Sequence, residues 1–171
     1  MTTRTTEERL LMWLQDAYAM EQEAETMLEA MAGRLEHYPE LRGRIEAHVQ
    51  ETRQQSSRLE DCIGQLGGST PLAKSAMANV MASMHAAGNA MMSDEVAKGV
   101  GISYAFEHME IASYRALVVA ARQAGRADIA NTCEAILREE VAMAEWLLEH
   151  QESVILAFLA REGTEGVTAK R

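Results

Sequence analysis

EHMEIASY, residues 107–114, places two glutamates one helical turn apart in the middle of a long helical pattern. Side chains that recur around it at steps of three and four form one stripe containing both acids: Val100, Ser103, Glu107, Glu110, Tyr114 and Val118. An ionised carboxylate away from water is costly unless it is paired, hydrogen-bonded or bound to a metal. The stripe therefore indicates a helix whose buried face carries acids that need a partner.

The composition favours an all-α protein. The chain has 171 residues, of which 47% are hydrophobic and 5% aromatic, with only two prolines. This length suits one domain with a sizeable core. The net charge of −10 opposes nucleic acids and anionic membranes but can attract cations.

The sequence carries no recognisable export or membrane signal. No apolar run approaches the roughly 20 residues of a membrane span. The first residues lack the basic-then-apolar order of a secretory signal. Cys62 and Cys133 form neither a CxxC motif nor a disulfide framework, which predicts free buried thiols. We therefore expect a cytoplasmic protein.

Start and stop signals divide the chain into four long helices. Thr5 and Glu8 match a capping box for a helix over residues 6–33. Pro39 suits the first turn of a second helix, which Gly67-Gly68 ends. Ser93-Asp94-Glu95 predicts a cap for a third helix, which runs to about residue 124.

The fourth helix is expected from about residue 126 to about residue 160. Residues 1–160 are thus expected to form the bundle domain. Residues 161–171, which contain two glycines and mixed charges, are expected to be a flexible C-terminal tail.

Residues 67–93 form a connection far longer than an antiparallel hairpin needs. Thr70-Pro71 opens a short, methionine-rich fifth helix in this segment, whose methionines are expected to lie on the bundle or to bind a partner. Two helical hairpins joined by one long crossover are typical of a ferritin-like four-helix bundle. The sequence therefore predicts that all-α fold.

Acids lie on or beside the apolar stripe of every long helix. The candidate metal ligands are Glu21, His48, Glu51, Glu107, Glu110 and Glu140. The chain length from Glu21 to Glu51 is close to that from Glu107 to Glu140, so each pair can reach one level of its hairpin. Converging carboxylates with no inward lysine or arginine repel one another strongly. Two divalent metal ions would resolve this conflict, with iron expected and manganese or zinc as alternatives.

The sequence meets the usual di-iron pattern only in part. That pattern takes one glutamate from each of two helices and Glu-x-x-His from each of the other two. Gln54 and Met143 stand where the two histidines are expected. His48, three residues before Glu51, is a possible replacement, and Thr52 competes with Glu51 for the inward direction.

Several residues near the candidate ligands are expected to have other roles. Glu110 is either a ligand or the acceptor of a hydrogen bond from a ligand or Tyr104. Glu25, His108 and Glu139 are expected to be solvated flanks, and Gln55 to support a ligand. Tyr18 and Tyr114 are expected in the core with satisfied hydroxyl groups.

Taken together, these segments resemble the bacterial ferritin-like family of the stress proteins YciE and YciF. The likeness covers nearly the whole chain, and its motifs are Asp16–Glu21, His48–Thr52, Glu107–Tyr114 and Glu139-Glu140. The resemblance implies a rubrerythrin-like bundle, a homodimer, a dinuclear metal site and a role in stress. Glu107-x-x-Glu110 also resembles a helix of rubrerythrins, but two distant cysteines cannot form their four-cysteine iron module.

Three functions fit these residues. The first is a redox centre of two iron or manganese ions that reacts with dioxygen or hydrogen peroxide, as in an oxidase or peroxidase. The second is metal buffering or structural metal binding without turnover. The third is a metal-free helical adaptor that uses the methionine-rich crossover. The sequence assigns no catalytic residue, and we expect the redox function.

Overall fold

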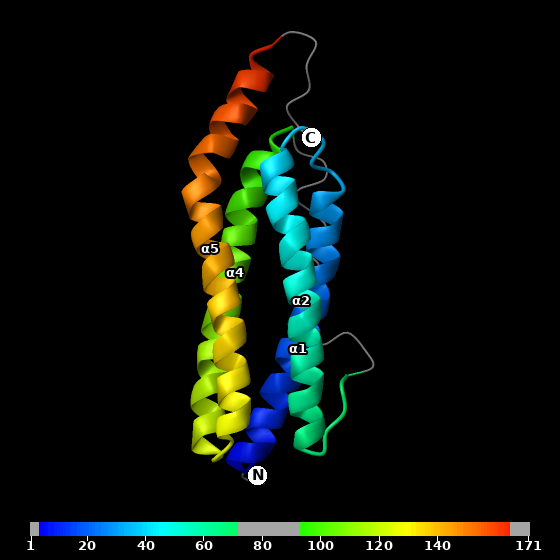
Figure 1. Ribbon diagram of the computed structural model, residues 1–171, viewed down its shortest axis with the longest axis vertical. Helices are drawn as coiled ribbons and strands as arrows, with labels where there is room; N and C mark the ends of the chain where they lie inside the picture. Colours follow the sequence, from blue (N-terminus) through cyan, green and yellow to red (C-terminus); the bar gives the residue numbers. More distant parts are fainter. Residues whose placement is uncertain (1–3, 72–92, 165–171) are drawn as a thin grey trace.

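Four long helices account for nearly all of the described chain: α1 (Thr6–Ala32), α2 (Pro39–Gln65), α4 (Glu95–Gln123) and α5 (Ala127–Glu162) (Figure 1). The computed structural model describes residues 4–71 and 93–164. The four helices confirm the predicted bundle. The fifth helix expected in the crossover falls on residues 72–92, and most of the expected C-terminal tail falls on 165–171; both lie outside the described residues.

Local sequence signals explain where these helices begin and end. The Thr5 side chain accepts a hydrogen bond from the Glu8 N–H (3.1 Å), and the Glu8 carboxylate accepts one from the Thr5 N–H (2.7 Å). This confirms the predicted capping box. Gly67 and Gly125 adopt positive φ values of 70° and 72° just after α2 and α4, where residues with a Cβ atom are strained.

The beginning of α4 differs from the prediction. Asp94 occupies the N-cap position but its side chain makes no capping hydrogen bond. Its carboxylate instead pairs with the Lys98 ammonium at 2.8 Å, one turn into the helix. The helix therefore begins where the sequence predicts, but without the side-chain cap expected from Ser93-Asp94-Glu95.

The helix directions give the bundle its connectivity. Along the long axis, α1 and α5 run one way while α2 and α4 run the other (Figure 1). The last residue of α2 and the first residue of α4 lie at opposite ends of the bundle. The connection between these helices therefore has to span the length of the bundle. The tightest packing lies within the α1–α2 and α4–α5 hairpins; between the hairpins, α1 packs against α4 more closely than α2 packs against α5. In the described residues, no helix is long and apolar enough to cross a membrane.

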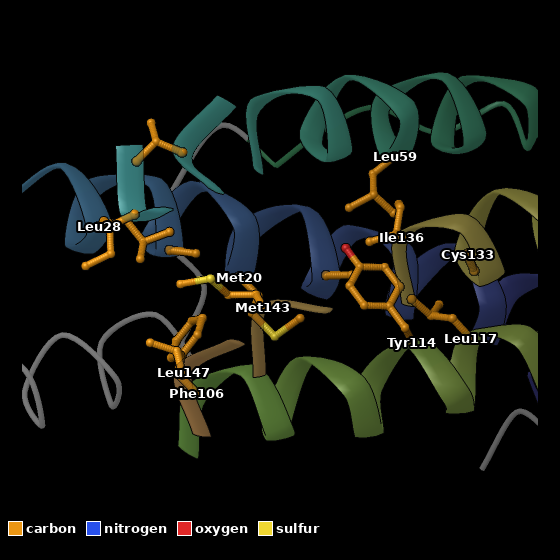
Figure 2. Packing of buried hydrophobic residues seen from close by; sticks show 14 of the residues in the cluster. Met20, Leu28, Leu59, Phe106, Tyr114, Leu117, Cys133, Ile136, Met143 and Leu147 are labelled. Atoms are coloured by element: carbon orange, nitrogen blue, oxygen red, sulfur yellow. The ribbon is translucent and has the colours of Figure 1, made fainter. Parts of the chain in front are cut away.

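Apolar side chains from all four helices fill the interior on both sides of a central polar layer. Ile136, Leu117 and the Tyr114 ring pack on one side, while Phe106, Leu147 and Leu28 pack on the other (Figure 2). Cys62 and Cys133 are free, buried thiols, as predicted. The layer between these apolar regions holds the candidate site.

Candidate metal centre

Every long helix contributes an acid or a histidine to the central polar layer. Glu21 comes from α1, His48 from α2, Glu107 and Glu110 from α4, and Glu140 from α5. Each of these five residues is at most 1% exposed. Helical periodicity puts each on the same face as the apolar core of its helix, which explains why all of them point into the interior.

Four of these residues form a tight cluster. His48, Glu107, Glu110 and Glu140 each offer one ligand atom, and these atoms lie within 4.8 Å of one another. The His48 Nε2 atom is 3.2 Å from Glu107 Oε2 and 3.4 Å from Glu140 Oε2. We call these four residues the carboxylate–histidine cluster. Its donors suit a single cation or a pair of cations that share carboxylates.

Several buried oxygens in the layer lack a hydrogen-bond partner. They are Glu21 Oε2, Gln55 Oε1, Glu107 Oε2, Glu110 Oε1 and Glu140 Oε2. Leaving a buried polar atom unsatisfied costs about 1–3 kcal/mol, and more for a charged one. No lysine or arginine is among the buried residues of the described chain. His48 is therefore the one cationic side chain that the described residues place among four buried carboxylates, so most of their charge has no matching cation.

Protons partly compensate these charges in the metal-free protein. Burial raises the pKa of Glu21 and of Glu110 well above 4.5, and the Glu140 carboxylate raises both further. Burial also raises the pKa of Glu107 to about 7, although His48 opposes this shift. Burial alone would lower the pKa of His48, but the neighbouring carboxylates of Glu107, Glu140 and Glu51 raise it to about 12. The cluster therefore holds protons at neutral pH that a metal ion would displace.

Glu51 lies outside the carboxylate–histidine cluster, although the sequence predicts it as a ligand. Its side chain is 38% exposed, and Oε2 lies 2.7 Å from His48 Nδ1 and 3.1 Å from Arg44 Nη1. Thr52 points inward instead and is 1% exposed. The structure therefore places Glu51 behind His48, on the side away from Glu107 and Glu140.

Tyr114 and Gln55 hold two of the acids in place. The Tyr114 hydroxyl points into the interior (Figure 2) and donates a hydrogen bond to Glu21 Oε1. Gln55 Nε2 donates to Glu140 Oε1 and to Glu139 Oε2, the latter at 3.0 Å. The first bond confirms the satisfied hydroxyl of Tyr114, and the others place Gln55 against Glu139 and Glu140.

Replacing Tyr114 by phenylalanine is expected to destabilise the metal-free protein by about 1–3 kcal/mol, because Glu21 then loses its hydrogen bond. Urea unfolding at neutral pH measures this change. Tyr104→Phe is the matched control, since Tyr104 is only partly buried and packs edge-on against exposed His108 at 4.4 Å. Equal stabilities of the two variants would show that the Tyr114 hydroxyl does not support Glu21.

The donor set fits a divalent metal. Carboxylate oxygens with one imidazole nitrogen are typical ligands of iron, manganese and zinc. A cation bound in the layer would satisfy its unpartnered buried oxygens. Glu21 lies close enough to interact electrostatically with Glu140, Glu107 and His48, and it can extend the set.

Of the three residues expected to be solvated flanks, His108 is exposed. Glu25 and Glu139 are only partly exposed, and they pair with Arg53 and Arg58. The sequence did not predict two arginine contacts beside the site. Arg44 pairs with Glu51, which contacts His48. Arg58 pairs with Glu139, which contacts Gln55. Heptad-like spacing of Arg44, Glu51 and Arg58 on α2 was the available signal.

Comparisons with known proteins agree on this fold. The family model described as "Domain of unknown function (DUF892)" matches residues 5–160. A protein of known crystal structure from Xanthomonas campestris pv. campestris is 60% identical, with a TM-score of 0.81, and the alignment covers 93% of this chain and 99% of that one.

More distant structures share the same architecture. The Escherichia coli stress protein YciF is 22% identical, with a TM-score of 0.75 and 87% of this chain and 96% of that one covered. The Desulfovibrio desulfuricans bacterioferritin is 18% identical, with a TM-score of 0.72 and 89% and 85% covered. These likenesses show the ferritin-like fold of the chain.

Proposed function

We propose that this chain, which belongs to the DUF892 family, binds two divalent metal ions in its central polar layer and uses them in redox chemistry. Iron is the proposed metal. The bacterioferritin that shares the fold contains a diiron site, and YciF is described as a stress protein. Both descriptions agree with a metal centre that meets oxidants.

One observation carries the proposal. Four buried glutamates and one buried histidine converge from all four helices, and each of the four carboxylates retains an oxygen without a hydrogen bond. A purely structural cluster would be expected to satisfy these oxygens with protein donors. Two divalent cations would neutralise four carboxylates, and they explain why the acids are inside.

The chain's own residues would bind and enclose the metals. Glu107, Glu110, Glu140 and His48 Nε2 are the proposed ligands, and Glu21, held by Tyr114, completes the set. Packed apolar side chains on both sides of the layer exclude bulk water. When bound, two ferrous ions would supply the two electrons that, with two protons, reduce hydrogen peroxide to two waters, or dioxygen to hydrogen peroxide.

The test is anaerobic loading of the metal-free protein with Fe(II), followed by peroxide. We expect near-ultraviolet absorbance to change in proportion to iron and to saturate at about two irons per chain. The Glu107→Ala variant should lose this change, because it removes an acid from the cluster. Circular dichroism confirms that the variant remains helical.

Two other results would redirect the proposal. Stoichiometric metal without any reaction with peroxide or dioxygen would indicate a metal buffer or a structural metal. Absence of bound iron, manganese and zinc under all loading conditions would contradict a metal function altogether. The homodimer expected from the family resemblance stays a prediction, and sedimentation measurements test it.

A further inference from the structure

A polar stripe runs along the α2 face beside the site. It consists of Arg44, His48, Glu51, Gln55 and Arg58, which recur at steps of three and four residues. The two arginines and Glu51 are partly exposed, while His48 and Gln55 are at most 1% exposed. The stripe therefore connects solvent with His48, which is a proposed ligand, and with Gln55, which contacts the proposed ligand Glu140.

His48 lies between carboxylates on opposite sides of its ring. Nδ1 faces the partly exposed Glu51 at 2.7 Å, and Nε2 faces the buried Glu107 and Glu140 at 3.2 and 3.4 Å. Arg44 Nη1, 3.1 Å from the same Glu51 oxygen, fixes that carboxylate from the solvent side. The three side chains Arg44, Glu51 and His48 thus form one continuous chain of contacts that ends at the cluster.

We infer that Glu51 is a positioning residue for His48: it accepts the Nδ1–H hydrogen bond and thereby leaves Nε2 as the nitrogen directed at the metal. This inference rests on the proposed metal function. A carboxylate on the remote nitrogen of a metal-bound histidine fixes the ring orientation and the tautomer, and it makes the ligand more basic. Arg44 restrains Glu51 in this role.

The geometry argues against Glu51 as a direct ligand. Its oxygen already accepts two hydrogen bonds, from His48 and Arg44. The imidazole ring separates it from Glu107 and Glu140. To reach the same metal, Glu51 would have to give up both hydrogen bonds and pass the ring. Supporting His48 requires no rearrangement.

The experiment compares Glu51→Ala and Glu51→Gln with wild type and with a control variant, Glu46→Ala. Glu46 lies on the same helix, is 53% exposed and pairs with Arg42 at 2.8 Å, so it reproduces the loss of a surface acid paired with an arginine. Zn(II) and Co(II) affinity and stoichiometry are measured by competition with a chelator. Long-range ¹H–¹⁵N spectra of the imidazoles, with and without Zn(II), report the His48 Nδ1–H, and a His48→Gln variant assigns it.

For Glu51→Ala we expect metal affinity to fall about 10- to 100-fold while the number of metals per chain is unchanged. The protected Nδ1–H signal of His48 should disappear with or without metal. Glu51→Gln should recover a large part of the affinity and the Nδ1–H signal, because its amide oxygen accepts the same hydrogen bond. Glu46→Ala should match wild type in both measurements.

The outcomes separate this inference from the metal function. Loss of one metal per chain in Glu51→Ala and Glu51→Gln would show that Glu51 is a ligand, which overturns the inference. An unchanged Nδ1–H signal in Glu51→Ala would overturn it too. If wild type binds no Zn(II) or Co(II), the metal function fails, yet the Nδ1–H signal in the metal-free protein still decides whether Glu51 positions His48.

Discussion

Replacing Glu107 and Glu140 together by glutamine is expected to abolish the stabilisation that metal gives the wild-type protein. At free metal of 100 to 1,000 times Kd, binding contributes about 2.7–4.1 kcal/mol. For a chain of 171 residues this corresponds to an increase in Tm of roughly 5–16 °C. Neutral amides are much poorer ligands for these metals than carboxylates, so metal should no longer raise the Tm of the double variant.

The same double variant should have the opposite effect without metal. Glutamine keeps the shape of glutamate but removes two buried carboxylates, so the metal-free variant should melt at or above the wild-type temperature at neutral pH. Thermal melts with excess metal and with chelator, together with metal analysis, measure both effects. Glu145→Gln, on an exposed position of α5, is the control and should behave as wild type. A double variant that still gains stability from metal would place the metal elsewhere.

The metal-free protein is expected to lose stability as the pH rises from about 5 towards 9. The folded protein keeps protons that the unfolded chain releases, because the pKa of Glu107 is raised from 4.5 to about 7. The pKa values of Glu21 and Glu110 are also raised well above 4.5. Each such proton contributes a slope of about 1.4 kcal/mol per pH unit. This stability is complete below pH 4.5 and is lost as the pH rises through the folded-state pKa values.

His48 extends the same trend to higher pH. Its pKa is raised from 6.5 to about 12, so its contribution is complete below pH 6.5 and disappears as the pH rises towards 12. Glu51 and Asp128 act in the opposite direction, since their pKa values are lowered and their contributions disappear in acid. Stability should therefore be greatest in mildly acidic solution.

Urea unfolding at several pH values with chelator present measures this dependence. Glu110→Gln should flatten the slope, because the amide cannot release a proton. Metal affinity should change in the other direction and increase with pH, since binding displaces protons from the cluster. A metal-free protein whose stability is flat between pH 5 and 9 would show that the buried acids are already balanced by other groups.

Much of the fold could be predicted because its signals are local and strong. Four apolar stripes with a period of 3.6 residues, the Thr5–Glu8 capping box and two glycines after helices fixed the helices to within a few residues. The side-chain cap predicted from Ser93-Asp94-Glu95 is not formed: Asp94 is the N-cap residue, and its carboxylate pairs with Lys98 instead. Periodicity says which residue types suit a position, but it does not show which of two partners a side chain selects.

The site was predictable at the level of helix faces and less so at the level of contacts. The burial of Glu21, Glu107, Glu110 and Glu140 followed from their stripes. Glu51 and Thr52 are neighbours about 100° apart around the helix, so either could face inward. The structure turns the threonine in and leaves the glutamate to His48 and Arg44. Such pairings depend on how α2 is rotated against α5, which a single stripe does not determine.

The two buried thiols have a consequence for work with peroxide. Burial raises the pKa of Cys62 and raises that of Cys133 to about 12. Peroxide attacks thiolates, and at neutral pH such buried groups remain thiols. Neither sulfur should therefore be oxidised to a sulfenic acid when the protein is exposed to peroxide. Peroxide consumption by the purified protein is therefore expected to carry no background from cysteine oxidation.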